Sequence, residues 1–584
     1  MKGRIIRSGM GTFLALCLLL FLFQSSSHLT FQYNPEETTQ EWVERKLAAM
    51  SLEEKVGQMF IVGFEPSELG KSELNTQVKS LIRDYHVGGV ILFERNIENP
   101  KQVGHLTNLL QRYSLSTSPG IPLVIAIDQE GGPVARFKEG VTQFPSNMAL
   151  GASRDPSLAY EAAQITGKEL RAMGINMNMA PVLDVNNNPA NPVIGIRSFA
   201  EDPEITAAFA VSTIQGYRAG HVLSVGKHFP GHGDTSVDSH VDLPTVDHDR
   251  KRLNSVELVP FRAAIAEGID AIMTAHVTFP AIDPTPGLPA TLSKRVLTGL
   301  LRQELGYTGV IMTDDMEMGA IADRFGTEEA AIRAVDAGAD MILISHTFSV
   351  QSKSIEAVIR AVKSGVLSET RIDQSVRRIL MMKAEKMGGS SIVADPLVNP
   401  KVIKEKVGTR KNREKAEEIA EKAVTLVKDD DKHLPLSPQK ASRILMITPV
   451  KAEELEKHLQ DQGFQTKVVQ VQFNPNREEI EGILEQAADF DAIIVGTARA
   501  QQNQGQVELV KGLQKTEKAV IVLGLNTPYD LSEFPSISTY LALYSTTPAS
   551  FKAAANAILG KISLSGRLPV SVPKQYPLGH GIRQ

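Results

Sequence analysis

The segment Leu223-Ser-Val-Gly-Lys-His-Phe-Pro-Gly-His-Gly-Asp-Thr-Ser-Val-Asp-Ser-His240 joins a short apolar run to a loop rich in titratable side chains. The run has the length and composition of a buried strand. Glycine and proline keep the residues after it out of a helix. Titratable groups on a loop that follows a buried strand are a common site of acid–base chemistry in enzymes. The segment therefore predicts a strand whose carboxyl end carries functional side chains.

Seven further apolar runs resemble this one, and amphipathic stretches separate them. The eight runs are residues 59–64, 87–93, 123–128, 175–185, 223–228, 271–276, 310–314 and 341–345. The spacing leaves room for a helix after each run, as parallel strands require. Polar residues end most of the runs: Asp128, Asp184, Lys227, His228, His276, Asp314, and Ser345 with His346. Eight strand–helix units predict a (β/α)8 TIM-type barrel with its active site at the carboxyl face. A doubly wound open sheet is the alternative, because it also places polar residues at strand ends.

Composition and order divide the chain of 584 residues into four parts. Residues 1–27 are an N-terminal targeting segment, and residues 38–387 form the barrel. Residues 388–415, which begin with Gly388-Gly-Ser-Ser391, form a linker and a linking helix, and a charged helix is expected over residues 401–426. Apolar runs in residues 416–584, with a helix at 452–460, predict a smaller α/β/α sandwich domain.

The targeting segment has the pattern of a secretory signal peptide. Lys2, Arg4 and Arg7 precede an apolar run over residues 10–23, and Ser25-x-Ser27 offers a cleavage site. We therefore expect a protein that is exported, either secreted or associated with the cell envelope; an uncleaved anchor is the alternative. The single cysteine, Cys17, follows Leu16 rather than a small residue, which disfavours a lipoprotein. The chain after the signal would have no cysteine and hence no disulfide.

Composition excludes one class of partner. A hydrophobic content of 42%, a charged content of 22% and a net charge of -5 are typical of a soluble globular protein. A nucleic-acid-binding protein needs a basic surface instead.

Two segments place carboxylates at the expected rim. In Ile311-Met-Thr-Asp-Asp315, a strand delivers Asp314 and then Asp315, although an aspartate here can also cap the next helix. In Asp128-Gln-Glu-Gly-Gly-Pro-Val-Ala-Arg136, Asp128 can accept hydrogen bonds from sugar hydroxyls and Arg136 can orient it. The two glycines are expected to let the backbone approach a ligand. A purely structural ion pair is the alternative for this segment.

The histidine-rich loop allows two chemistries. His232, Asp234, Asp238 and His240 could ligate zinc or iron. Alternatively, Asp238 orients His240 as a proton donor. Residue types alone leave both open, since no firm metal-binding spacing is present. Any one of these histidines could also serve only to satisfy backbone groups in a tight loop.

Together, these motifs resemble glycoside hydrolase family 3, in its bacterial exported two-domain β-N-acetylglucosaminidase branch. The hallmark is Lys227-His-Phe-Pro-Gly-His-Gly233 followed by Asp238-Ser-His240. Further motifs occur in order, namely Asp128-Gln-Glu-Gly-Gly132, Ala180-Pro-Val-Leu-Asp184, Ile194-Gly-Ile-Arg197, Gly309-Val-Ile-Met-Thr-Asp314, Thr425-Leu-Val-Lys428, Leu434-Pro-Leu436 and Ser565-Gly-Arg-Leu-Pro569. The resemblance covers roughly residues 40 to 575. One departure is Pro133, where relatives often carry a basic residue.

The resemblance implies a role for each matching position. Asp314 matches the nucleophile, and His240 with Asp238 matches the acid/base dyad. The positions that match binding residues for the N-acetylglucosamine unit are Asp128, Arg136, Arg197, Lys227 and His228. The resemblance implies no metal and no cofactor. Glu317 should not be mistaken for the acid.

The implied function is a retaining exo-β-N-acetylglucosaminidase (hydrolase, β-N-acetylhexosaminidase type) acting on cell-wall fragments of the muropeptide type, as in peptidoglycan recycling. A histidine suits proton transfer because its ordinary pKa lies close to neutrality. The neutral form of the histidine would not repel an anionic acceptor such as phosphate. A glycoside phosphorylase that uses the same site is therefore a variant of this hypothesis. A metal-dependent hydrolase built on His232, Asp238 and His240 and a non-catalytic wall-binding protein are the other hypotheses.

Overall fold

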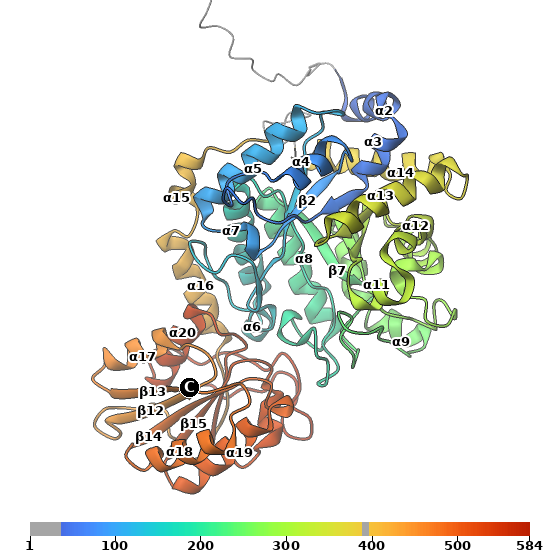
Figure 1. Ribbon diagram of the computed structural model, residues 1–584. Helices are drawn as coiled ribbons and strands as arrows, with labels where there is room; N and C mark the ends of the chain where they lie inside the picture. The colour runs from blue at the N-terminus through green and yellow to red at the C-terminus, as the bar shows by residue number, and fades with distance from the viewer. Residues whose placement is uncertain (1–36, 388–395) are drawn as a thin grey trace, which may run out of the picture.

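The computed structural model describes residues 37–387 and 396–584 (Figure 1). The expected signal segment, residues 1–27, and the linker sequence Gly388-Gly-Ser-Ser391 lie outside the described residues. Within the described ranges, no helix is both long and apolar enough to cross a membrane.

Eight parallel strands close into a barrel, in the order β1-β10-β9-β8-β7-β6-β3-β2. They are β1 (Phe60–Val62), β2 (Gly89–Leu92), β3 (Val124–Ile127), β6 (Met177–Asn178), β7 (Leu223–Phe229), β8 (Ala271–Thr274), β9 (Val310–Asp315) and β10 (Met341–Ile344). Each predicted apolar run overlaps one of these strands, and the strand residues are almost all buried because helices cover the outside. The predicted (β/α)8 barrel is confirmed, and the open-sheet alternative is wrong because β1 pairs with β10.

Helices follow the strands and form the outer layer (Figure 1). The barrel helices are α2 (Thr39–Ala49), α3 (Leu52–Gln58), α4 (Thr76–Arg83), α5 (Pro100–Leu115), α6 (Asn147–Ser153), α7 (Pro156–Ala172), α8 (Pro203–Ala219), α9 (Arg250–Ser255), α10 (Val259–Ala266), η4 (Arg295–Glu304), α11 (Gly319–Phe325), α12 (Thr327–Ala337), α13 (Phe348–Lys363) and α14 (Glu369–Met382). Ser51 caps α3: its side chain accepts from Glu54 N, and the Glu54 side chain accepts from Ser51 N.

The charged helix predicted over residues 401–426 is wrong in extent. The structure has α15 (Ile403–Lys406) and α16 (Arg410–Ala423), with a break between them. Gly408 sits in the break at φ +59°, and a Cβ there would lie 2.6 Å from the Gly140 carbonyl oxygen. Thr409 then caps α16, so a new helix starts. The domain boundary predicted at residue 415 falls inside α16.

The C-terminal domain is a six-stranded sheet with helices on both faces. In spatial order the strands are β11 (Thr425–Asp429), β16 (Thr539–Ala542), β15 (Ala519–Gly524), β14 (Ala492–Thr497), β12 (Arg443–Thr448) and β13 (Gln465–Gln470). The side chains of alternate residues in β12 lie on opposite faces of the sheet. Ile444 and Met446 share a core with α17 (Glu453–Gln460) and α20 (Pro548–Ile558). Leu445 and Ile447 share another with α18 (Arg477–Ala487) and α19 (Gln504–Leu513). This confirms the predicted α/β/α sandwich.

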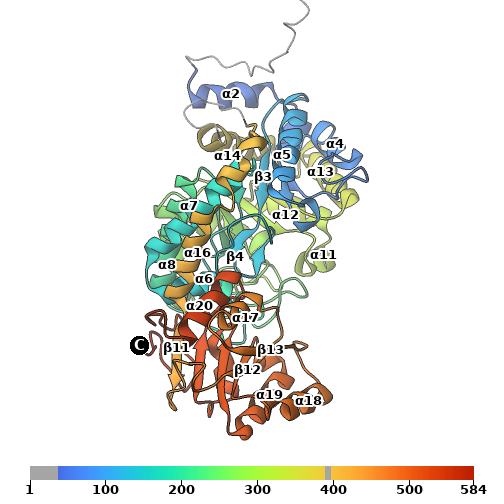
Figure 2. The same cartoon turned by 90° about the vertical axis from the view of Figure 1, so that its left-hand side faces the viewer.

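The C-terminal domain lies against one end of the barrel domain (Figure 2), and loops that follow β3 and β6 contact it. The Ser146 hydroxyl donates to the Tyr544 carbonyl oxygen at 2.6 Å, and Asn186 donates to the Tyr529 hydroxyl at 3.1 Å. Glu201 accepts from the backbone and the hydroxyl of Ser571, both at 2.8 Å. The C-terminal domain therefore supports loops at the carboxyl face of the barrel.

Candidate active site

A cavity of about 500 Å³ opens at the carboxyl ends of the barrel strands. Its lining residues lie between positions 91 and 346, so the barrel alone forms it and the C-terminal domain supplies no lining. A larger groove of about 900 Å³ lies elsewhere, between α7 and residues 397–415 on the outside of the barrel. The structure brings seven of the eight predicted site residues to the smaller cavity: Asp128, Arg136, Arg197, Lys227, His228, His240 and Asp314.

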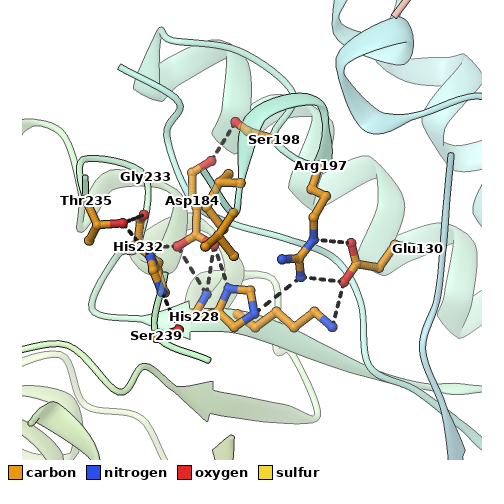
Figure 3. A network of polar contacts seen from close by, with 12 residues as sticks. Glu130, Asp184, Arg197, Ser198, His228, His232, Gly233, Thr235 and Ser239 are labelled. Atoms are coloured by element: carbon orange, nitrogen blue, oxygen red, sulfur yellow. Dashed lines mark hydrogen bonds and ion pairs between the residues drawn. The ribbon is translucent and has the colours of Figure 1, made fainter. Parts of the chain in front are cut away.

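A network of ion pairs lines the cavity, and Figure 3 shows the part of it that joins Glu130 and Arg197. The Lys227 ammonium lies 2.8 Å from Asp128 Oδ1 and 2.7 Å from Glu130 Oε1. Arg197 donates to both oxygens of Glu130, at 2.8 and 2.9 Å. Arg136 donates to Asp128 Oδ2 at 3.0 Å. The predicted pairing of Arg136 with Asp128 is therefore present, within a larger network.

Charge compensation keeps this network ionised. Burial alone would raise the carboxyl pKa values, but Lys227 and Arg136 lower that of Asp128, and Arg197 and Lys227 lower that of Glu130 to about 2. Burial alone would lower the pKa of Lys227, and the two carboxylates raise it above its ordinary value. The cavity therefore presents fixed charges and hydrogen-bonding groups to a polar ligand.

Glu130 is the residue that the sequence prediction left without a role. It is 8% exposed and stands two positions after Asp128. Side chains two apart in an extended segment share a face, and that spacing was the available signal. That the next two glycines let the backbone approach a ligand stays a prediction, and the structure shows a second reason for them. Gly131 and Gly132 have φ of +95° and +56°, and a Cβ on Gly132 would lie 2.7 Å from the Ser146 Cβ. They make the β4 (Gln129–Gly131) to β5 (Val134–Ala135) turn and its close packing possible.

A second network fixes the end of β7 (Figure 3). Asp184, which is fully buried, accepts from His228 Nδ1 at 2.7 Å and from the backbone of His232 at 2.6 Å. The other ring nitrogen of His228 points toward Arg197, at 3.5 Å. Burial raises the pKa of Asp184, and its contacts with His228 and His232 lower it more. Asp184 thus orients His228, a positioning role that the sequence analysis did not assign.

Asp314 is the penultimate residue of β9 and lines the cavity beside the other strand-end residues. Its Oδ1 accepts from the backbone of Asp315 at 2.8 Å. Burial raises its pKa, but His228, His276 and that backbone amide lower it more, so its carboxylate is the favoured form. Glu317 accepts from the backbone of His346 and Thr347, which is a structural role consistent with its exclusion as the acid. Asp314 therefore presents an ionised carboxylate to the cavity.

The loop after β7 carries the predicted dyad. His240 Nδ1 lies 2.7 Å from Asp238 Oδ1, and the His240 backbone donates to the same oxygen at 2.8 Å. The His240 side chain is 62% exposed at the cavity mouth, and that of Asp238 is 38% exposed behind it. Asp238 does not line the cavity, so any effect of Asp238 on a bound ligand would run through His240.

The alternative metal set of His232, Asp238 and His240 does not converge. Both ring nitrogens of His232 already bond to hydroxyls, Thr235 Oγ1 and Ser239 Oγ, at 2.9 Å each. Among the residues that the structure describes, ligand-type side chains gather closely enough for a metal only at Asp234, His248 and Glu257. The geometry of the loop therefore favours the dyad.

Comparison with known proteins agrees with this geometry. The protein-family model described as the glycosyl hydrolase family 3 N-terminal domain matches residues 51–382. The one described as the family 3 C-terminal domain matches residues 424–578. The chain belongs to glycosyl hydrolase family 3. Membership confirms the resemblance drawn from the sequence motifs and makes this chain a glycoside hydrolase.

Individual relatives extend over most of this family 3 chain. A curated β-hexosaminidase A of Pseudoalteromonas piscicida is 34% identical over 565 residues, which cover 85% of this chain and 91% of that protein. The structure of a family 3 β-N-acetylglucosaminidase from Paenibacillus sp. str. FPU-7 superposes with a TM-score of 0.83 at 41% identity, over 90% of this chain and 99% of that one. A β-glucoside phosphorylase, BglX, bound to 2FGlc superposes with a TM-score of 0.79 at 25% identity, over 93% and 98%. The family 3 enzyme thus shares its whole two-domain architecture with these proteins.

Proposed function

We propose that this family 3 enzyme is a retaining exo-β-N-acetylglucosaminidase that removes terminal N-acetylglucosamine from cell-wall fragments of the muropeptide type. One observation carries the proposal: a single cavity presents an ionised Asp314, the Asp238-supported His240, and the charged network around Lys227. The β-hexosaminidase and β-N-acetylglucosaminidase relatives support the choice of sugar.

The first step transfers the sugar to the enzyme. The Asp314 carboxylate attacks the anomeric carbon, and the bond from that carbon to the leaving oxygen breaks. His240 donates its proton to the leaving oxygen and becomes neutral. In the second step, neutral His240 removes a proton from water, the water oxygen bonds to the anomeric carbon, and Asp314 leaves as a carboxylate. Two displacements on one carbon retain its configuration.

The network that lines the cavity would hold the sugar for this attack. Lys227 and Arg136 offer N–H donors, and Asp128 offers acceptor oxygens, so hydroxyls of one sugar ring can be bound in both directions. His228, oriented by Asp184, adds a fixed ring nitrogen. We propose these residues, with Arg197, as the binding site of the N-acetylglucosamine unit.

Phosphorolysis is the second candidate for the acceptor step. After proton donation His240 carries no charge, so it would not repel phosphate as a carboxylate base would. The structural likeness to a β-glucoside phosphorylase supports testing this variant. Product analysis with and without phosphate separates the two: sugar 1-phosphate indicates phosphorolysis, and free sugar in both buffers indicates hydrolysis.

Labelling with a 5-fluoro N-acetylglucosaminyl inactivator tests the function. The wild type is expected to release nitrophenol from nitrophenyl N-acetyl-β-glucosaminide and to carry the label on the peptide containing Asp314. An Asp314→Ala variant should lose both properties, and the surface control Asp323→Asn should keep both. A label on another carboxylate, or full activity of Asp314→Ala, would refute the assigned nucleophile.

Export is part of the proposal, and it rests on the sequence of residues 1–27. Fractionation of cells that produce the full chain tests it. We expect activity in the medium or the cell envelope, and loss of that location when residues 2–27 are deleted. Activity confined to the cytosol in both cases would contradict export.

A further inference from the structure

The two ends of the loop that carries Asp238 and His240 are held together by a contact outside the cavity that we propose binds the sugar (the sugar cavity). His248 Nε2 lies 2.6 Å from Asp234 Oδ2, which closes a segment whose ends are 14 positions apart. Asp238 and His240 both lie within this segment. Whatever strengthens the contact between residues 234 and 248 therefore restricts the movement of the acid/base residue.

A third side chain, Glu257, lies at the same place and is 3% exposed. The ligand atoms of Asp234, His248 and Glu257 all lie within 4.8 Å of one another. Glu257 Oε1 accepts from Arg252 at 3.2 Å and from Asn187 at 3.4 Å. Its other oxygen, Oε2, is buried without any hydrogen-bond partner, and so is Asn187 Oδ1.

Two buried acceptors without donors are costly, because each has lost its water. A cation among these oxygens removes that cost. Arg252 is the positive group already present, 3.2 Å from Glu257 Oε1 and 3.8 Å from Asp234 Oδ2. The Arg252 guanidinium contacts Glu257 Oε1 and leaves Glu257 Oε2 unpaired. A side chain that orients a metal-ligating carboxylate makes this kind of contact. With a neutral imidazole, two carboxylates and one guanidinium leave a net charge of one negative unit. Arg252 Nε is also unpaired, and because it is a donor the cation does not account for it.

We propose that Asp234, His248 and Glu257 bind one divalent metal ion of the zinc class, with Asn187 at its edge. One imidazole nitrogen and two carboxylate oxygens suit zinc, which also accepts a fourth ligand from solvent. None of the three residues lines the sugar cavity. The ion therefore holds together the two ends of the loop between residues 234 and 248 and takes no part in the displacement steps. Its site differs from the set of His232, Asp238 and His240.

Zinc titration of the full chain tests the proposal. Protein stripped with a chelator is titrated with zinc chloride in a calorimeter, and metal content is measured after gel filtration. The wild type and the control His458→Ala are each expected to retain about one equivalent, while His248→Ala retains none. Glu257→Gln, which keeps the Asp234–His248 contact, should weaken zinc binding by at least about tenfold.

Hydrogen exchange of residues 234–248 supplies the second measurement. Zinc should slow exchange there in the wild type and leave it unchanged in His248→Ala and Glu257→Gln. No retained zinc in the wild type, or equal retention by His248→Ala, would overturn the site and leave the cluster as an Arg252–carboxylate–histidine network. Both measurements are independent of turnover, so they separate failure of the metal site from failure of the proposed hydrolysis.

Discussion

Five side chains form the ion-pair network that lines the sugar cavity. Lys227, Arg136 and Arg197 are positive, and Asp128 and Glu130 are negative. The side chains of Lys227 and Glu130 are 3% and 1% exposed, so solvent screens their pair little. Each carboxylate holds two cations in place, and loss of one disturbs both the fold and the binding surface.

Glu130→Gln is predicted to lower both stability and activity. Removing one partner of a buried pair leaves uncompensated charge, so we expect the free energy of unfolding to fall by about 3 kcal/mol. Lys227 and Arg197 would shift, and kcat/KM should fall about a hundredfold. Urea unfolding and steady-state kinetics measure the two effects.

The control is Glu481→Gln, which breaks an exposed pair with Arg477. Such pairs contribute little, so neither quantity should change appreciably. If Glu130→Gln behaved like this control, the network would have no role in binding.

His240→Ala is predicted to show a leaving-group effect. A proton donor matters most when the leaving oxygen is basic, so cleavage of a disaccharide should fall by about 10²- to 10³-fold. Nitrophenolate leaves without much help, so kcat/KM for its release, which reports the first step only, should fall by less than about tenfold. Parallel kinetics with the two substrates measure this difference. Equal losses with both would argue against proton donation by His240.

At the scale of elements, α11 supports the loop that carries Asp238 and His240. The backbone of Gly319, its first residue, donates to the His240 carbonyl oxygen at 3.3 Å. A Cβ at Gly319 would lie 2.9 Å from that oxygen and 3.1 Å from the Val241 carbonyl oxygen. The helix and the loop therefore fit together only where this residue lacks a side chain.

Gly319→Val is predicted to displace the loop without unfolding the barrel. Misplacing an acid/base group by about 1 Å costs rate, so we expect kcat to fall at least about tenfold while KM changes less. Gly482→Val is the matched control, because a Cβ at Gly482 meets no atom within 4 Å. Kinetics with circular dichroism as a folding check measure the outcome. A normal kcat in Gly319→Val would show that the loop tolerates the shift.

At the scale of the whole molecule, the second domain acts on the site from a distance. It supplies no lining residue, yet it contacts the segments around Ser146, Asn186 and Glu201. Asn147, next to Ser146, donates to the Arg197 carbonyl oxygen at 2.7 Å. The stability of this domain therefore affects the loop that holds Arg197.

Asp530→Asn is predicted to change how stability depends on pH. Asp530 is fully buried in the C-terminal domain, and burial raises its pKa to about 7, despite the hydrogen bond that it accepts from the Ala500 backbone. A carboxyl with a raised folded pKa contributes most below its unfolded pKa, and that stability is lost as pH rises toward 7. Between pH 5 and pH 8 the wild type should lose about 3 kcal/mol at this site.

The variant should lose little over the same range, because an amide does not titrate and still accepts from the Ala500 backbone. Urea unfolding at pH 5, 6, 7 and 8 measures the difference, with exposed Asp489→Asn as the control. Parallel curves for the wild type and Asp530→Asn would contradict the raised pKa.

Local patterns predicted the elements well where burial was complete. Most of the barrel strands carry nearly continuous apolar runs, since both faces of a parallel barrel strand are covered. β13 was not predicted, because it is an edge strand of mostly polar, partly exposed residues. The helix over 401–426 was overextended because its charge pattern hides the break at Gly408, which depends on a contact with Gly140 from the barrel.

The order of motifs by itself determined the family, the barrel and the candidate residues, because strand periodicity and loop chemistry are written in neighbouring positions. Only the tertiary structure decided which charges are paired. Glu130 joins Lys227 and Arg197, and Asp184 orients His228, through contacts 44 to 97 positions apart. Such contacts depend on barrel closure and on the exclusion of water, and neither is encoded in a local pattern.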